Sequence, residues 1–176
     1  MKKQISLVAV IVMMVVSSTL FAQSNKNVIS TLAKSIRSHK SIEVSFTYRA
    51  SDMEEAKEGK AYFQDGSYKV IFDDQQTISD GKTLWHYLVE DEEVMVGNAS
   101  DDDNPFKILD QLERDSSGIT PTLDSKGNLK SVEIEVEEGS KITLNIVEMK
   151  FDQDYPEAFF TFDEKAYPNV EVIDMR

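Results

Sequence analysis

The sequence predicts a mainly β protein with two helices, built as a strongly curved antiparallel sheet or incomplete barrel. Three observations support this fold class. About ten short segments have strand patterns, most of them separated by Gly- or Asp-containing turns. One amphipathic helix precedes the strands, and a second is inserted among them. The chain has 176 residues and 40% hydrophobic content, enough for one domain with a core.

Residues 1–22 have the pattern of a secretory signal peptide. The basic start Met1-Lys2-Lys3 precedes an apolar run over residues 5–16 and a stretch of small residues that ends at Ala22. We expect cleavage after Ala22, which leaves residues 23–176 as a single domain. An uncleaved membrane anchor is the alternative, but the apolar run is shorter than the ~20 residues of a spanning helix.

The mature chain is strongly acidic. Loss of Lys2 and Lys3 changes the formal charge from −13 to −15, with 17 basic and 32 acidic residues. The sequence offers no basic stripe, so we expect no nucleic-acid partner. Cysteine is absent, which excludes disulfides and the acylated cysteine of a bacterial lipoprotein. These features favour an exported soluble protein, for which the bacterial periplasm is the simplest compartment.

The first half of the mature chain begins with a helix and continues as a strand meander. Val28, Leu32 and Ile36 recur every four residues and form the apolar stripe of a helix that ends near His39. Residues 42–48 alternate apolar and polar with period two, which predicts a half-buried strand. Further strands are predicted at 59–64 and 68–72, around a turn at Asp65-Gly66.

The next hairpin is centred on Asp80-Gly81, a dipeptide that favours a type I′ turn. The strand that follows, residues 84–89, is almost continuously apolar or aromatic. Such a run is typical of a strand that is covered on both faces. The pattern does not decide which face looks towards the protein interior, and we expect the face of Trp85 to do so.

The second half begins with an inserted helix, predicted from Pro105 to about Arg114. Asn104 and Pro105 are a good N-cap and first helical residue, and Asp101-Asp102-Asp103 would favour the positive helix end. Calcium binding by these acidic residues is the alternative, although the spacing of a known calcium loop is missing. Strands are then predicted at 119–123, 129–136, 142–146 or on to 151, 158–163 and 170–173.

Candidate catalytic residues are few, and we expect neither an enzyme nor a metal or other cofactor. His39 and His86 are the only histidines, and neither has a nucleophile or metal ligand at motif spacing. For His86 we expect solvent or a hydrogen bond within its strand. An active site assembled from distant residues is the alternative, because such a site leaves no local motif.

Several motifs resemble the LolA-like family of periplasmic outer-membrane lipoprotein carriers. The closest match is Ile78-Ser79-Asp80-Gly81-Lys82-Thr83-Leu84-Trp85-His86-Tyr87, followed by Asn104-Pro105-Phe106-Lys107-Ile108-Leu109. Ser45-Phe46-Thr47, Glu58-Gly59, Phe160-Thr161-Phe162 and Pro168-Asn169-Val170-Glu171-Val172-Ile173-Asp174 occur in the same order. The resemblance covers nearly the whole mature chain.

The resemblance implies an incomplete antiparallel β-barrel with a helical lid over a hydrophobic cavity. It also implies a monomer that takes lipoprotein acyl chains from an inner-membrane release complex to an outer-membrane acceptor. A filled core is the alternative for each aromatic residue. The residues expected to bind acyl chains, in the cavity or on the lid, are Phe46, Tyr48, Phe63, Tyr68, Val70, Phe72, Trp85, Tyr87, Phe106, Leu109, Leu112, Ile142, Leu144, Phe160 and Phe162.

The chain departs from the family at one position. Many carriers have a basic residue beside a proline after the strand that matches Gly59, and it is thought to pin the lid. Here the corresponding residues are Gln64-Asp65-Gly66. The lid must therefore be held in another way. A sensor or a binding protein for another lipid or hydrophobic envelope ligand is the alternative function.

Overall fold

The computed structural model describes residues 25–100, 104–137 and 140–176, and its centre is one ten-stranded sheet. The strand order is β10-β6-β5-β4-β3-β2-β1-β9-β8-β7. Neighbouring strands are antiparallel except β10 and β6, which are parallel. The strands are β1 (Ser41–Ala50), β2 (Lys57–Gln64), β3 (Ser67–Phe72), β4 (Gln75–Ser79), β5 (Thr83–Leu88), β6 (Glu93–Asn98), β7 (Ile119–Leu123), β8 (Leu129–Glu137), β9 (Ser140–Phe151) and β10 (Glu171–Asp174).

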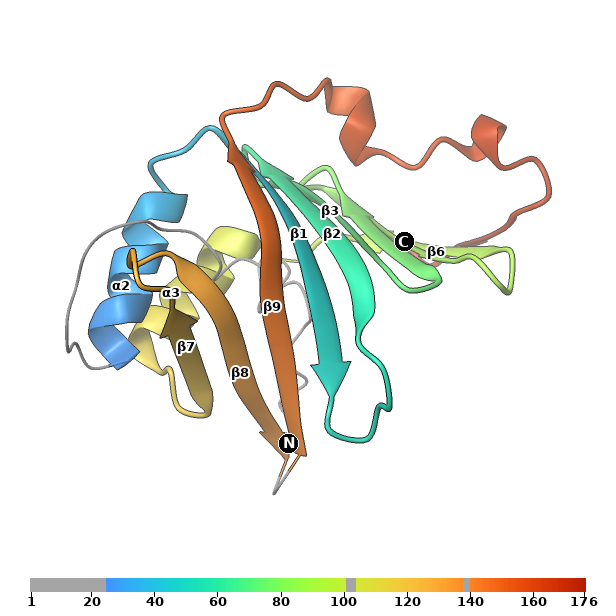
Figure 1. Cartoon of the computed structure of the whole chain (residues 1–176). Helices are drawn as coiled ribbons and strands as arrows, with labels where there is room; N and C mark the ends of the chain where they lie inside the picture. The colour runs from blue at the N-terminus through green and yellow to red at the C-terminus, as the bar shows by residue number, and fades with distance from the viewer. Residues whose placement is uncertain (1–24, 101–103, 138–139) are drawn as a thin grey trace.

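The sheet is curved and does not close, because β7 and β10 remain its two edges. In Figure 1, two helices, α2 (Asn25–Ile36) and α3 (Pro105–Arg114), lie beside each other at the β7–β8 end. The segment after β9 leads away to the β6 end. The mainly β fold class and the curved, open sheet are therefore confirmed.

The two faces of the sheet carry separate hydrophobic clusters. The inner cluster lies between α2, α3 and one face of the sheet, and Ile29, Leu32 and Ile36 contribute the apolar stripe of α2. The outer cluster lies on the opposite face, where Ile78, Tyr87 and Val94 contact residues of the C-terminal segment. We call these the inner face and the outer face. Alternation along each strand assigns its side chains to one face or the other.

The Asp-Gly turns differ from each other, and one prediction was wrong. Asp65 and Gly66 both have positive φ, at 50° and 85°, and join paired residues of β2 and β3, as a two-residue type I′ turn requires. At Asp80-Gly81 only Gly81 has positive φ. The Asp80 carboxylate instead accepts hydrogen bonds from the backbone N–H groups of Lys82 and Thr83. This side-chain bonding makes an Asx-type turn with a longer loop.

A second correction concerns the C-terminal segment. Residues 158–163 were predicted as a strand, but the structure has the 3₁₀ helix η2 (Glu157–Phe160) there, followed by η3 (Glu164–Ala166). The segment runs over the outer face, so its aromatic side chains are buried without strand pairing. The last predicted strand is confirmed as β10, which pairs with β6.

Candidate binding site

The inner face of strands β1 to β3 forms an apolar wall. On β1, Ile42, Val44 and Phe46 are all at most 4% exposed, because each second residue points to the same side. Phe63 on β2 and Val70 on β3 extend the wall across the sheet. The predicted alternation of residues 42–48 is confirmed.

Gly59 gives the Phe46 ring its place in this wall. The two residues are opposite each other on β1 and β2. A Cβ atom at position 59 would lie 2.4 Å from Cζ of Phe46, closer than van der Waals contact permits. Any side chain at position 59 would thus displace the ring, which is 1% exposed.

Helix α3 covers the inner cluster with two leucines. Leu109 and Leu112 are three residues apart, lie on one side of the helix, and are 1% and 8% exposed. Both belong to the inner cluster. The side chain of Phe106, the third residue predicted for this face, lies outside the described part of the chain. Asp101–Asp103 also lie outside it, so their predicted role at the positive helix end and the alternative of calcium binding stay predictions.

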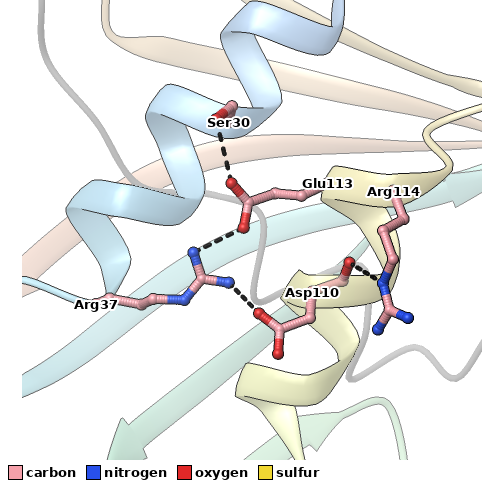
Figure 2. Close-up of polar contacts among 5 residues, drawn as sticks. All are labelled: Ser30, Arg37, Asp110, Glu113 and Arg114. Atoms are coloured by element: carbon pink, nitrogen blue, oxygen red, sulfur yellow. Dashed lines mark hydrogen bonds and ion pairs between the residues drawn. The ribbon is translucent and has the colours of Figure 1, made fainter.

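An ionic cluster ties α3 to α2, as Figure 2 shows. Arg37 lies just after the last residue of α2, and its guanidinium donates to Asp110 at 2.5 Å and to Glu113 at 2.8 Å on α3. The Ser30 hydroxyl donates to the other oxygen of Glu113 at 3.1 Å. Apolar contacts thus hold α3 on its inner side, while exposed or half-exposed polar groups hold it to α2.

The sequence contains only one weak signal for this cluster. Arg37 is separated from Asp110 by 73 positions and from Glu113 by 76, so no local pattern connects them. Only the spacing of Asp110 and Glu113, three residues apart on a predicted helix, would have suggested a common partner.

Beyond the apolar wall, the inner face becomes partly polar. Thr77 on β4 and His86 on β5 are opposite each other, and Thr77 Oγ1 lies 3.2 Å from His86 Nδ1. Burial lowers the pKa of His86 below its ordinary value, so the ring is neutral at pH 7. Leu84 and Leu88 flank His86 on the same face of β5. A hydrogen bond within the strand of His86 was one of the two predictions for this residue, and it was wrong, because the bond goes to the neighbouring strand β4.

The structure brings most, but not all, of the predicted acyl-chain residues together. The inner cluster and the side chains packed against it include Phe46, Tyr48, Phe63, Tyr68, Val70, Phe72, Leu109, Leu112, Ile142 and Leu144.

The placement of Trp85, Tyr87 and Phe162 beside these residues was wrong. All three belong to the outer cluster, because Leu84 packs at the inner cluster and its neighbours on β5 alternate away from it. Phe160 is 2% exposed, and its ring lies against Tyr155 and Phe159. It belongs to neither cluster.

The outer face is covered by the C-terminal segment between β9 and β10, whose backbone is hydrogen-bonded to the sheet. The Gln64 amide donates to the Tyr155 carbonyl at 2.9 Å and accepts from the Tyr155 N–H at 3.1 Å. The Tyr155 hydroxyl donates to Glu43 at 2.7 Å, which lowers the pKa of Glu43. Further along the segment, Phe162 and Tyr167 lie against Tyr87.

Two kinds of feature are missing from the described ranges. No group of three or more His, Cys, Asp or Glu side chains there could hold a metal ion. No helix within the same ranges is long and apolar enough to cross a membrane.

Comparison with known proteins supports the fold alone. No family model matches the chain, and no curated protein matches its sequence. An uncharacterized conserved protein from Thermus thermophilus has a similar structure, with a TM-score of 0.50 and 13% identity. The similarity covers 77% of this chain and 91% of that one. At this identity the match concerns the arrangement of the sheet and helices.

Proposed function

We propose that this protein is a periplasmic carrier that binds acyl chains of lipoproteins between the inner face and α3. The observation that carries the proposal is the composition of the inner cluster. A curved, open sheet supplies an apolar wall, and the described part of α3 covers it with Leu109 and Leu112. The wall is apolar over several adjacent strands, as a site for a long hydrocarbon chain requires.

The leucines of α3 and a bound acyl chain would compete for the same apolar wall, and their burial energies are comparable. Full burial of a leucine side chain stabilises by ~1.5–3 kcal/mol, so the two leucines of α3 contribute about 3–6 kcal/mol. Each buried methylene of an acyl chain contributes ~0.8 kcal/mol. Roughly four to eight methylenes would therefore offset the leucines, by the same estimate of about 0.8 kcal/mol each. α3 acts as a lid that fills the site without cargo and makes cargo release possible.

The direction of transport follows from the resemblance together with the predicted signal peptide. The carrier takes acyl chains from an inner-membrane release complex and delivers them to an outer-membrane acceptor. Arg37, Asp110 and Glu113 hold the lid here, in place of the basic residue that many related carriers have elsewhere. Exposed ion pairs contribute at most about 1 kcal/mol each, which suits a contact that must open.

The experiment that tests the proposal compares two variants of α3 in displacement of a fluorescent fatty acid. In Leu109→Asp a carboxylate replaces the side chain that would cover the bound chain, and we expect binding to be lost. Gln111→Asp introduces the same charge at an exposed position of the helix and is expected to bind normally. Unchanged binding by Leu109→Asp would exclude α3 as the cover.

A second measurement separates the carrier from a sensor of envelope lipid or protein. Native mass spectrometry of the protein purified from periplasm should show co-purifying lipoprotein or lipid. A bare protein under the same conditions would contradict the carrier and favour the sensor.

A further inference from the structure

One polar pair interrupts the inner face at its β4–β5 part. Strand pairing places a continuous row of residues across the sheet, each opposite the next, with side chains on the inner face. Thr77 and His86 are the polar members of this row, which reads Val44, Ala61, Val70, Thr77, His86, Met95.

Burial changes along the same row. Val44, Ala61 and Val70 are 0–3% exposed, whereas Thr77 and His86 are partly exposed. The row thus leads from a dry apolar wall to a polar, more accessible position. Amphiphilic ligands have the same order of properties, with a hydrocarbon chain followed by a polar group.

From this juxtaposition we infer that His86, oriented by Thr77, donates a hydrogen bond to the carbonyl oxygen at the polar end of an acyl ligand. The inference rests on the proposed function and deepens it, because it gives the bound chain a direction. The chain lies over β4, β3 and β2, and its ester, amide or carboxyl oxygen lies at β5.

The hydrogen-bonding capacity of His86 fits this role. Thr77 Oγ1 is the one hydrogen-bond partner that the described residues offer its ring. In the tautomer in which the threonine hydroxyl donates to Nδ1, the ring proton is on Nε2, where it can be donated to a ligand oxygen. Burial lowers the pKa of His86, so this donor is neutral and suits an uncharged ester or amide carbonyl.

The dimensions also fit. Four strand spacings separate β5 from β1, roughly 19 Å along the sheet. One acyl chain spans about half of a bilayer core of ~30 Å, or roughly 15 Å. A chain whose carbonyl is at His86 can therefore extend about three strand spacings, over β4 and β3 to β2 in the apolar wall.

The test uses ligands of equal size that differ in their oxygens. Methyl decanoate and tridecane have the same number of non-hydrogen atoms, and only the first has a carbonyl. Their competition against a fluorescent acyl probe is measured for the wild type and for His86→Phe. We expect the variant to bind methyl decanoate roughly tenfold more weakly and tridecane equally well, as loss of one hydrogen bond predicts.

Two further variants separate hydrogen bonding from packing. His86→Gln keeps an N–H donor and is expected to recover part of the preference for the ester, while Thr77→Val is expected to lose part of it. His39→Gln changes the other histidine, which contacts Asp152 and stacks on Phe151 of β9, away from the β4–β5 part of the sheet, and serves as control. Decanoate, compared with methyl decanoate, shows whether a free carboxylate or an ester is preferred.

The outcomes distinguish this site from the proposed function. Equal weakening of methyl decanoate and tridecane by His86→Phe would overturn the carbonyl site, because His86 would then be a packing residue. Unchanged binding of both ligands would also overturn it and would leave the carrier intact. If the wild type bound none of the ligands, the carrier itself would be excluded and the carbonyl site with it.

Discussion

The inner and outer faces of one sheet are covered in different ways. The outer cover is a segment held by backbone hydrogen bonds to Gln64 and by rings that pack on Tyr87. The inner cover, α3, is held by two buried leucines in the described part and by ion pairs of Arg37. From this difference we propose that the outer cover stays in place, whereas α3 can be displaced by a hydrocarbon chain.

The largest expected effect concerns the outer cover. Phe162→Ala removes a ring that is 8% exposed and contacts Tyr87 and Tyr167. We expect the free energy of unfolding to fall by about 3–4 kcal/mol, the usual cost of a buried Phe→Ala change. Urea unfolding measures it, with Val147→Ala, at a position 67% exposed, as control. Binding of an acyl probe by the folded variant should be unchanged. A loss of probe binding would show that the outer cover also takes part in binding and would contradict the difference between the two faces.

A smaller effect is expected from the inner cover. Arg37→Met removes the guanidinium that binds Asp110 and Glu113. Because these pairs are partly exposed, each contributes less than about 1 kcal/mol to the free energy of unfolding. The rate at which an acyl probe dissociates should nevertheless rise, since α3 opens more easily. Stopped-flow fluorescence measures this rate, and Arg49→Met is the matched change of an exposed arginine. Equal rates in the two variants would exclude a role for Arg37 in closing the lid.

The smallest effect is a pH dependence of the inner face. Burial lowers the pKa of His86 in the folded protein below the ~6.5 of an unfolded histidine. Between these two values the unfolded chain binds more protons, so stability decreases as the pH falls from about 6.5. His86→Gln should remove this part of the decrease, as urea unfolding at several pH values would measure. An identical pH profile in the wild type and the variant would show that His86 does not cause this loss of stability.

The face on which many side chains lie could be predicted from the sequence. Period-two alternation, for example, assigns Val44 and Phe46 to the same face without further information. The same method fails at β5, where Leu84, Trp85, Tyr87 and Leu88 are all apolar or aromatic and no alternation exists. The decision there depends on Phe162, far along the chain, whose packing leaves no local signal.

The turns show a similar limit. Asp65-Gly66 and Asp80-Gly81 are the same dipeptide, and both were correctly predicted to be turns. Their backbones differ because the Asp80 carboxylate bonds to the N–H groups of Lys82 and Thr83. Composition predicts the place of a turn, and side-chain bonding decides its type.

The central claim, that α3 moves while the outer cover stays, is tested most directly by distances between pairs of spin labels. The chain has no cysteine, so labels attach only to introduced ones. One pair joins α2 and α3, at Lys34→Cys and Gln111→Cys, and the other joins the sheet and η2, at Lys60→Cys and Glu157→Cys; all four positions are exposed. On addition of methyl decanoate, the first distance should lengthen and the second should not change. A first distance that stays constant while the ligand binds would contradict the account.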